Sequence, residues 1–358
     1  MVSPSSTRRR VLQAASVLQA SSVSRLPSLV RIPASVTGRS ASQSIFGLGV
    51  AAAEGSAFNE AHASEPSPRS VPSLPSRVRR LSFKTSDGLR LSFLDSGSPG
   101  GGLRPRDPGL NDTPSESPAL VLIPGWLMPA EVFLHQLSEF TRDHRVVVLD
   151  PRSQGQSALH ASTPSERLAR DRARDIHELI EHLGLGDLVL IGWSLGVLEC
   201  LDCIRLHGVK RLRGLVLIDN SVGEGPAPPA RSSRRPRTTA EFDAYIEGFV
   251  QAMIRHREDE PIAHAVRQSA LRLRRTPARA FEILGKPWPR ETYRDAVYEV
   301  RQPVWYAITP RYREQGERLT EYHPRVSVTL YEDATHAIFI DQPVRFNADL
   351  RAFLESVY

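Results

Sequence analysis

The stretch Gly192-Trp193-Ser194-Leu195-Gly196 joins a short apolar run to a helical pattern, and this junction decides the fold. The apolar run covers Asp187–Ile191, and residues compatible with a helix extend over Leu195–His207. A G-x-S-x-G pentapeptide between a strand and a helix is typical of a sharp, strained turn that exposes the serine hydroxyl. The two glycines allow that turn to pack tightly, and a helix N-terminus favours negative charge beside it. The sequence therefore predicts Ser194 as a candidate nucleophile.

Strand and helix signals alternate on both sides of this turn. An Asp87-Gly88 turn predicts a hairpin, and the short apolar runs that follow predict strands buried on both faces of a parallel sheet. The alternation predicts an α/β protein with a mostly parallel, eight-stranded sheet and helices on both faces. The predicted strands are Leu81–Thr85, Leu89–Leu94, Ala119–Ile123, Arg145–Leu149, Asp187–Ile191, Leu215–Ile218, Val304–Ile308 and Val326–Leu330, and the predicted core helices are Glu131–Arg142, Pro164–Leu183, Leu195–His207 and Pro343–Val357.

Four blocks resemble the α/β-hydrolase superfamily over residues 78–358, and they follow one another along the chain in the order that this family shows. Besides the serine pentapeptide, Leu122-Ile123-Pro124-Gly125-Trp126 is similar to the family's segment after strand 3, with proline in place of the usual histidine. The run 150–157 resembles the D-x-R-G-x-G-x-S loop after strand 4, with Ser153 in place of a glycine. The run 333–343 resembles the histidine loop before the last helix. This resemblance implies an α/β-hydrolase fold with a helical cap inserted after strand 6.

The chain order nucleophile, acid, base assigns the partners of Ser194. Of eleven histidines, His336 is the expected base because it alone lies between the last predicted strand and the last predicted helix. The family usually carries the acid after strand 7, but in this sequence Tyr312 occupies that position. Asp219, directly after strand 6, is the predicted acid, a position that some relatives use, among them a group of haloalkane dehalogenases. Glu314 and Asp333 are the weaker alternatives.

Acyl transfer also needs donors for the oxyanion and room for the acyl group. The expected oxyanion donors are the backbone N–H groups of Trp126 and Leu195, and packing is the alternative role of the Trp126 side chain. Trp193 and Phe339 are expected to bind substrate as apolar pocket walls, together with Ile338. Neither a cofactor nor a metal is expected for this chemistry.

A serine nucleophile separates the predicted reaction from that of relatives with aspartate there, because serine forms an acyl-enzyme. We therefore expect a serine hydrolase that cleaves a small-molecule carboxylic ester. The Gly192–Gly196 and Pro124–Trp126 segments also resemble pimeloyl-carrier-protein methyl ester esterases, and the cofactor-free haloperoxidases share the same triad. Perhydrolase chemistry and a non-catalytic binding protein with this fold remain alternatives.

Residues 222–302 are long enough to form the cap. They begin with a segment rich in proline, glycine and arginine at 223–236, and helical patterns follow at 240–256, 261–275 and 290–300. Arginines of this insert have two interpretations, binding of an anionic substrate group or an acidic carrier protein, or a solvated helix face. These arginines are Arg267, Arg272, Arg274, Arg275 and Arg279.

Length and charge bound the remaining function classes. The 358 residues provide an irregular segment at 1–76, a core at 77–221 and 303–358, and the cap at 222–302. Of the net charge of +6, residues 1–63 carry +4, so no nucleic-acid partner is expected for the rest. No stretch reaches the roughly 18 apolar residues of a membrane span. Cys200 and Cys203, within one predicted helix, are expected to be small buried residues rather than a disulfide.

Residues 1–76 differ from the rest and have no acidic residue before Glu54. Thr7–Gln13 resembles a twin-arginine export signal, and the apolar run Ile45–Ala53 is followed by an A-x-A pattern at 61–63. A long polar-interrupted stretch separates the two features, and a transit peptide or a mis-assigned start codon explains the same composition. The segment is predicted to be disordered or a targeting signal peptide, which leaves export and a cytoplasmic location both open.

Overall fold

The computed structural model describes residues 74–99, 117–159, 165–226, 235–254, 260–273, 277–284 and 288–358. All of them belong to one compact unit, Ser44–Tyr358. The predicted N-terminal segment lies outside the described residues except for 74–76. So do Arg274 and Arg275 of the cap, and the side chain of Arg279.

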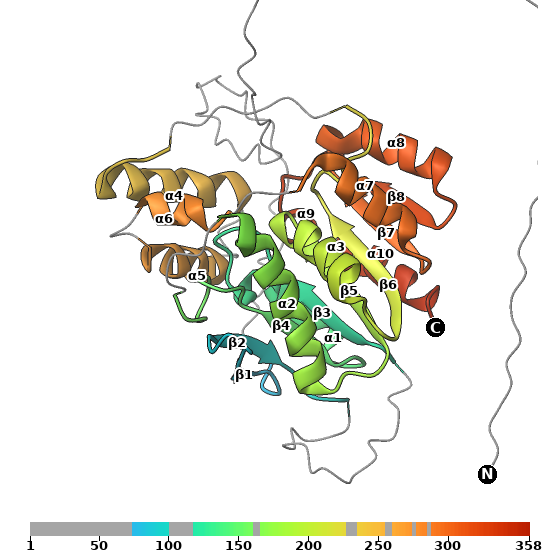
Figure 1. Ribbon diagram of the computed structural model, residues 1–358, viewed down its shortest axis with the longest axis horizontal. Coiled ribbons are helices and arrows are strands. Elements are labelled where there is room, and N and C mark those ends of the chain that lie inside the picture. The colour runs from blue at the N-terminus through green and yellow to red at the C-terminus, as the bar shows by residue number, and fades with distance from the viewer. Residues whose placement is uncertain are drawn as a thin grey trace, which may run out of the picture. The chain divides into compact units, whose positions relative to one another are not determined.

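An eight-stranded sheet forms the centre of the fold (Figure 1), with the strand order β1-β2-β4-β3-β5-β6-β7-β8. β2 pairs antiparallel with β1 and β4, whereas the other neighbours are parallel. The predicted, mostly parallel sheet is thereby confirmed. The strands are β1 (Arg79–Lys84), β2 (Arg90–Asp95), β3 (Ala119–Ile123), β4 (Val146–Leu149), β5 (Leu188–Trp193), β6 (Leu212–Ile218), β7 (Val304–Ile308) and β8 (Val326–Leu330).

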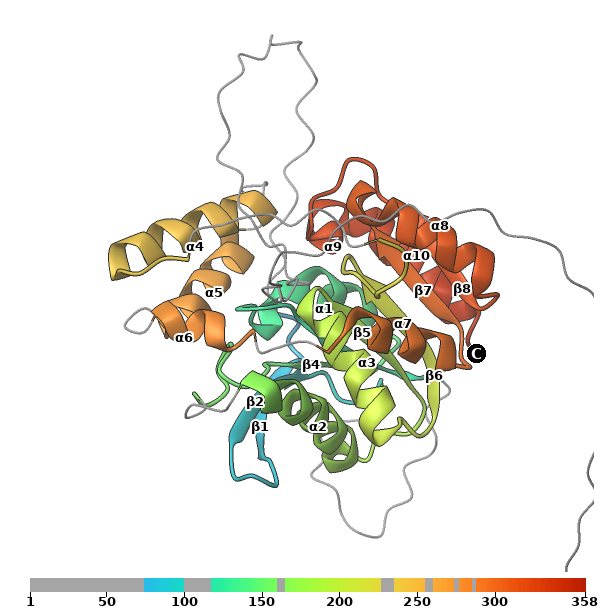
Figure 2. The same cartoon turned by 45° about the horizontal axis from the view of Figure 1, so that its top comes forward.

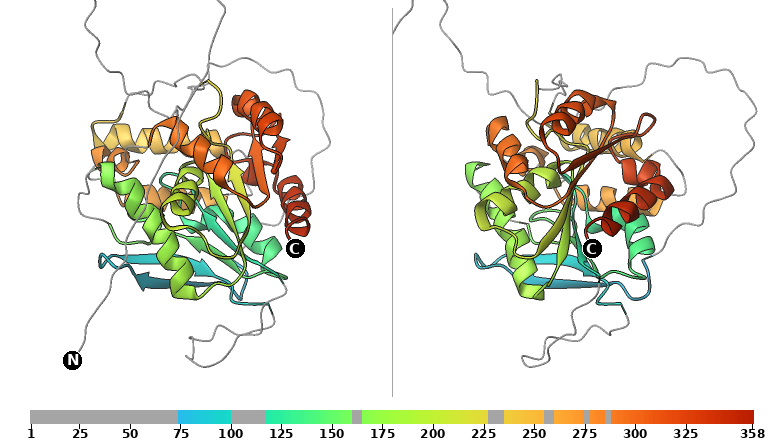
Figure 3. Two further views of the ribbon diagram at one scale, coloured as in Figure 1. Left: turned by 45° about the vertical axis from the view of Figure 1, so that its right-hand side comes forward. Right: turned by 90° about the vertical axis from the view of Figure 1, so that its right-hand side faces the viewer.

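Helices cover both faces of the sheet, as predicted. α2 (Ser165–Leu183), α3 (Leu195–His207) and α7 (Arg290–Glu299) lie on one face, where α3 packs against the other two. α1 (Leu134–Phe140) and α10 (Pro343–Glu355) pack together on the opposite face (Figure 3, right). The other helices of the core are the 3₁₀ turn η1 (Ala130–Phe133), α8 (Arg313–Tyr322), which packs on β7 and β8, and the short α9 (Ile338–Asp341).

Three helices of the insert gather to one side of the sheet (Figure 2), and we refer to them as the predicted cap: α4 (Thr239–Met253), α5 (Glu260–Leu271) and α6 (Pro277–Glu282). α4 begins with a capping box between Thr238 and Glu241. The predicted cap range 222–302 also includes α7, but α7 packs on α3 of the core. The reason is topological, because the parallel strands β6 and β7 need a crossover helix on the sheet.

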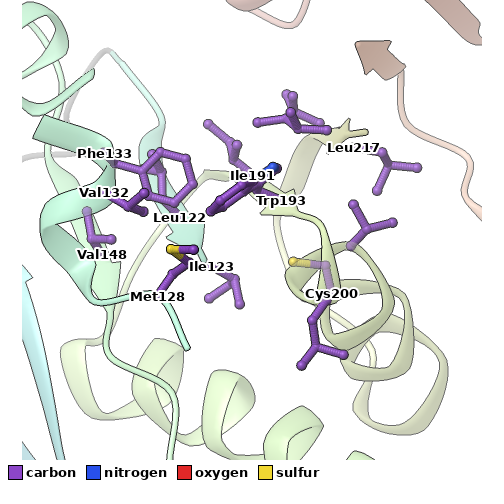
Figure 4. Close-up of a cluster of buried hydrophobic side chains, with 14 of the residues drawn as sticks. Leu122, Ile123, Met128, Val132, Phe133, Val148, Ile191, Trp193, Cys200 and Leu217 are labelled. Atoms are coloured by element: carbon purple, nitrogen blue, oxygen red, sulfur yellow. The ribbon is translucent and has the colours of Figure 1, made fainter. Parts of the chain in front are cut away.

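Apolar side chains of the central strands form the core below the carboxyl edge of the sheet. Figure 4 shows Leu122, Val148, Ile191 and Leu217 on neighbouring strands, all of them buried. Burial of such side chains stabilises the fold by roughly 1.5–3 kcal/mol each. Cys200 packs in the same core, and it and Cys203 are free, buried thiols as predicted. Within the described ranges, no helix is both long and apolar enough to cross a membrane.

Candidate active site

Ser194 occupies the sharp turn between β5 and α3. Its backbone lies at φ 54° and ψ −121°, a region that costs a residue other than glycine about 1–3 kcal/mol. A Cβ on Gly192 would lie 2.5 Å from the Gly196 carbonyl oxygen, and one on Gly196 would collide with the carbonyl of Ile123. Both glycines are therefore required by the close packing of this turn. The Ser194 amide donates to the carbonyl of Ile218 at 3.0 Å, which fixes the turn to β6.

His336 connects the serine to a carboxylate. Its Nε2 lies 2.9 Å from Ser194 Oγ and its Nδ1 lies 2.7 Å from Asp219 Oδ2. Asp219 is buried, whereas 23% of the His336 side chain is exposed. With Nδ1–H donating to Asp219, Nε2 is left to accept the serine proton. The structure thus brings together the three residues that the sequence predicts as a triad.

The second carboxylate oxygen of Asp219 is held by the end of β7. Oδ1 accepts hydrogen bonds from the backbone N–H of Thr309 at 2.8 Å and from its hydroxyl at 2.7 Å. Two donors on one oxygen leave Oδ2 oriented toward His336. Sequence reasoning missed Thr309, although its place directly after β7 was a signal, because β7 pairs with the strand that carries Asp219.

The alternative acids lie in different surroundings. Glu314 is exposed in the first turn of α8 and pairs with Arg318 at 3.5 Å. Asp333 is exposed in the loop after β8. Neither makes the hydrogen bond to His336 that Asp219 makes. Among the described carboxylates, the geometry therefore favours Asp219.

Asn220 supports the serine turn from the neighbouring loop, another contact that the sequence did not indicate. Its Nδ2 donates to the carbonyl of Ser194 at 2.7 Å, and its own carbonyl accepts the Tyr306 hydroxyl at 2.7 Å. Burial raises the pKa of Tyr306 well above its ordinary value, so its hydroxyl stays a neutral donor. The strained Ser194 is thus braced by β5, β6 and β7.

The Gly125–Trp126 peptide lies beside the serine hydroxyl. A Cβ on Gly125 would lie 2.9 Å from Ser194 Cβ and 3.4 Å from Ser194 Oγ. Among the backbone hydrogen bonds of turns, loops and helix ends in the described residues, neither the Trp126 amide nor the Leu195 amide is a donor. The role of these two amides as oxyanion donors stays a prediction.

The side chain of Trp126 packs against two helices of the predicted cap. Its indole Nε1–H donates to the carbonyl of Ala280 at 2.6 Å. Its ring contacts Tyr245 and Phe249 of α4 and Phe281 of α6, with centroids 6.2, 5.6 and 5.1 Å away. The alternative packing role therefore describes this side chain.

Trp193 and Phe339, expected as pocket walls, instead support the histidine loop. Trp193 is 1% exposed, and its Nε1–H donates to the carbonyl of His336 at 2.8 Å. Phe339 is 0% exposed and stacks on Phe133 with centroids 4.6 Å apart. The two rings also contact each other edge to face. Aromatic character alone did not separate a pocket wall from a buried support.

The loop after β4 accommodates a serine at a position where the family pattern has glycine. Ser153, which stands where the family has glycine, adopts φ 67°. Asp150 is buried and accepts hydrogen bonds from the amides of Ala130 at 2.7 Å and Gln156 at 2.9 Å. Burial raises the pKa of Asp150 although Arg80 opposes that shift. The loop therefore keeps its buried carboxylate network with a serine in the left-handed position.

Two of the five cap arginines bind groups of the chain itself. Arg272 donates to the carbonyls of Gly155 and Ser157, the latter at 2.8 Å, and so ties α5 to the loop after β4. Arg267 pairs with Glu247 of α4 at 2.9 Å. Arg272 is exposed, as the solvated-face interpretation expects, and it also anchors the end of α5 to the core. In the described ranges, no group of three or more His, Cys, Asp or Glu residues is arranged to hold a metal ion.

Comparison with known proteins identifies the family of the chain. The sequence matches the profile of the Alpha/beta hydrolase family over residues 120–349. The chain belongs to this family. The match confirms the predicted superfamily and enzyme class.

Individual relatives are more distant. The chain is 26% identical over 272 residues to a protein of Agrobacterium fabrum named "Putative carbamate hydrolase RutD", covering 68% of this chain and 95% of that protein. Among solved structures, it is similar to the esterase RhEst1 from Rhodococcus sp. ECU1013, with 19% identity, a TM-score of 0.61 and coverage of 79% and 100% of the two chains. A bromoperoxidase from Bacillus anthracis shares 17% identity and a TM-score of 0.59, with coverage of 77% and 100%. Such structural likeness shows the fold alone.

Proposed function

We propose that this α/β hydrolase cleaves a small-molecule carboxylic ester through an acyl-enzyme on Ser194. The observation that carries the proposal is the unbroken hydrogen-bonded chain from Ser194 Oγ through His336 to Asp219. Serine attack gives an acyl-enzyme, and the chain supplies both the base and the group that orients it.

The first half of the reaction forms the acyl-enzyme. Ser194 Oγ attacks the ester carbonyl carbon while His336 Nε2 takes the hydroxyl proton. The tetrahedral oxyanion receives hydrogen bonds from the Trp126 and Leu195 amides. When the bond to the leaving alcohol breaks, His336 returns that proton to the alcohol oxygen. The buried Asp219 carboxylate stabilises the imidazolium between these two transfers.

The second half of the reaction hydrolyses the acyl-enzyme and releases the carboxylic acid product. A water molecule attacks the acyl carbon while His336 takes a proton from it. The bond to Ser194 Oγ then breaks, and His336 returns the proton to the serine. The 23% exposure of the His336 side chain is compatible with this entry of water.

Covalent labelling tests the nucleophile directly. A fluorophosphonate probe should label the folded protein at Ser194, identified by mass spectrometry of the labelled peptide. Ser194→Ala is the matched control and should not react. An unlabelled wild-type protein, alongside a reactive control esterase, would refute the proposal.

A substrate panel then separates the alternatives. We expect turnover of p-nitrophenyl acyl esters, with acyl length and charge varied to find the substrate class. Aryl carbamates belong in the same panel because of the relative named as a carbamate hydrolase. Peroxide-dependent halogenation without ester turnover would favour the haloperoxidase alternative. Absence of any turnover together with tight ester binding would favour a binding protein.

A further inference from the structure

The oxyanion segment ends in a turn with an unusual backbone. The amide of Met128 donates to the carbonyl of Gly125 at 3.3 Å, which closes a four-residue turn over 125–128. Its third residue, Leu127, adopts φ 63°. A positive φ at this place is typical of a type II turn, which normally carries glycine or asparagine there. A leucine in that conformation is strained, so another contact must hold the turn.

Gln154, in the loop after β4, makes that contact. Its side-chain Oε1 accepts the Leu127 amide, the N–H at the centre of the turn. The side chain is 1% exposed, so the hydrogen bond is screened from water. Breaking it would leave the Leu127 amide buried without a partner.

Only the oxygen of the Gln154 amide is used. Its Nε2 is buried and has no hydrogen-bond partner in the part of the chain that the structure describes. A buried donor without a partner is costly, and native structures rarely keep one without a reason. Leucine or methionine would fill a similar volume without that cost. The oxygen acceptor is therefore what distinguishes glutamine at this position.

The loop that carries Gln154 is itself fixed by the cap. The amide of Gly155 donates to Ser269 Oγ of α5 at 2.9 Å, and Arg272, directly after this helix, donates to the Gly155 carbonyl. The backbone next to Gln154 is thus anchored on one side while its side chain holds the turn on the other.

We propose that Gln154 is a positioning residue for the oxyanion hole. It fixes the turn 125–128 through Leu127, and thereby places the neighbouring Trp126 amide beside Ser194 Oγ. It touches neither substrate nor the reacting atoms. This inference rests on the proposed acyl transfer, because only that reaction uses the Trp126 amide as an oxyanion donor.

The kinetic test compares two variants of similar size. Gln154→Met removes the acceptor, and Gln154→Glu keeps an oxygen in its place. Loss of one oxyanion donor costs about 10²- to 10³-fold in kcat; a displaced donor should cost less, roughly tenfold for Gln154→Met with KM within about twofold. Gln154→Glu should stay within about threefold of wild type. Binding of a trifluoromethyl ketone, whose serine adduct carries an oxyanion, should weaken in parallel with kcat.

An equal loss in both variants, or a rise in KM with kcat unchanged, would overturn the proposal. A second readout does not depend on activity. The Leu127 amide should exchange with solvent at least tenfold faster in Gln154→Met than in wild type or in Gln154→Glu, by NMR-detected hydrogen exchange. If the wild type turns over no ester, the proposed function fails, whereas unchanged Leu127 exchange would contradict the role of Gln154 itself.

Discussion

Thr309 donates its backbone N–H at 2.8 Å and its hydroxyl at 2.7 Å to Oδ1 of Asp219, the carboxylate oxygen that does not face His336. The two residues follow the neighbouring parallel strands β7 and β6. The end of β7, where the family resemblance leads one to expect the acid, here binds a carboxylate that follows β6. In the proposed mechanism, Thr309 therefore orients Asp219, and through it His336, without touching the substrate.

Thr309→Val should lower kcat by roughly tenfold, because it removes one hydrogen bond to a buried carboxylate, worth about 1.5 kcal/mol or more. The backbone N–H of residue 309 would remain in place. Thr309→Ser keeps the hydroxyl and is the matched control. Steady-state kinetics on one p-nitrophenyl ester checks the prediction, and equal kcat values for the two variants would contradict it.

Gly125→Ala should lower kcat by about 10²-fold, because its Cβ would lie 2.9 Å from Ser194 Cβ and displace the Trp126 amide from the oxyanion. Gly208→Ala is the comparison. Gly208 adopts φ 68° at the end of α3 and a Cβ there would meet no atom within 4 Å, so the change should cost only about 1 kcal/mol of stability. Activity and melting temperature, measured on both variants, distinguish the two effects. A parallel loss of stability and activity in both would count against the placement of Gly125.

Much of the fold could be predicted because its signals are local. The Asp87-Gly88 turn lies between β1 and β2, and the apolar runs at β3, β7 and β8 match the observed strands residue for residue. Ser194 and Asp219 could be predicted because each directly follows a strand, and His336 because it lies between the last strand and the last helix.

The contacts that could not be predicted join distant segments. Thr309 and Asp219 are 90 residues apart, and Gln154 and Leu127 are 27 apart. For Thr309 the signal was its place directly after β7, which pairs with β6; nothing in the local sequence indicates that Gln154 and Leu127 meet. The burial of Trp193 and Phe339 under the histidine loop is a similar case, since an aromatic side chain suits a pocket wall and a core equally well.

Arg272→Gln should raise KM for neutral and anionic esters alike, because Arg272 holds α5 against the loop after β4 through the carbonyls of Gly155 and Ser157. A substrate-binding arginine would affect the anionic esters alone. The measurement is KM for a pair of esters that differ only in a carboxylate on the acyl chain. Arg267→Gln, which removes a contact within the cap, is the control for general loosening of α5.

Asp202→Asn should change how stability depends on pH. Asp202 is buried and binds Arg205 at 3.0 Å; burial raises its pKa from 3.8 to about 6, although Arg205 opposes the shift. The folded state thus keeps this proton to a higher pH than the unfolded state, so the free energy of unfolding falls as pH rises from about 4 to about 6 and then levels off.

The asparagine variant lacks this titration. Relative to wild type, its free energy of unfolding should therefore improve between pH 4 and pH 7, by up to about 3 kcal/mol. Urea unfolding of both proteins at the two pH values gives the difference. A constant offset between them would show that Asp202 does not titrate in this range.

The assignment of Asp219 as the acid of the triad is tested most directly by comparing kcat for Asp219→Asn and Glu314→Gln, with melting temperatures measured on both. Asp219→Asn should keep the fold but favour the wrong tautomer of His336, so kcat should fall by roughly 10³- to 10⁴-fold. Glu314→Gln should cost less than about tenfold, because this carboxylate is exposed and pairs only with Arg318 in the described structure. If Glu314→Gln is the more damaging change in two well-folded variants, the acid follows β7 and the account of the site is wrong.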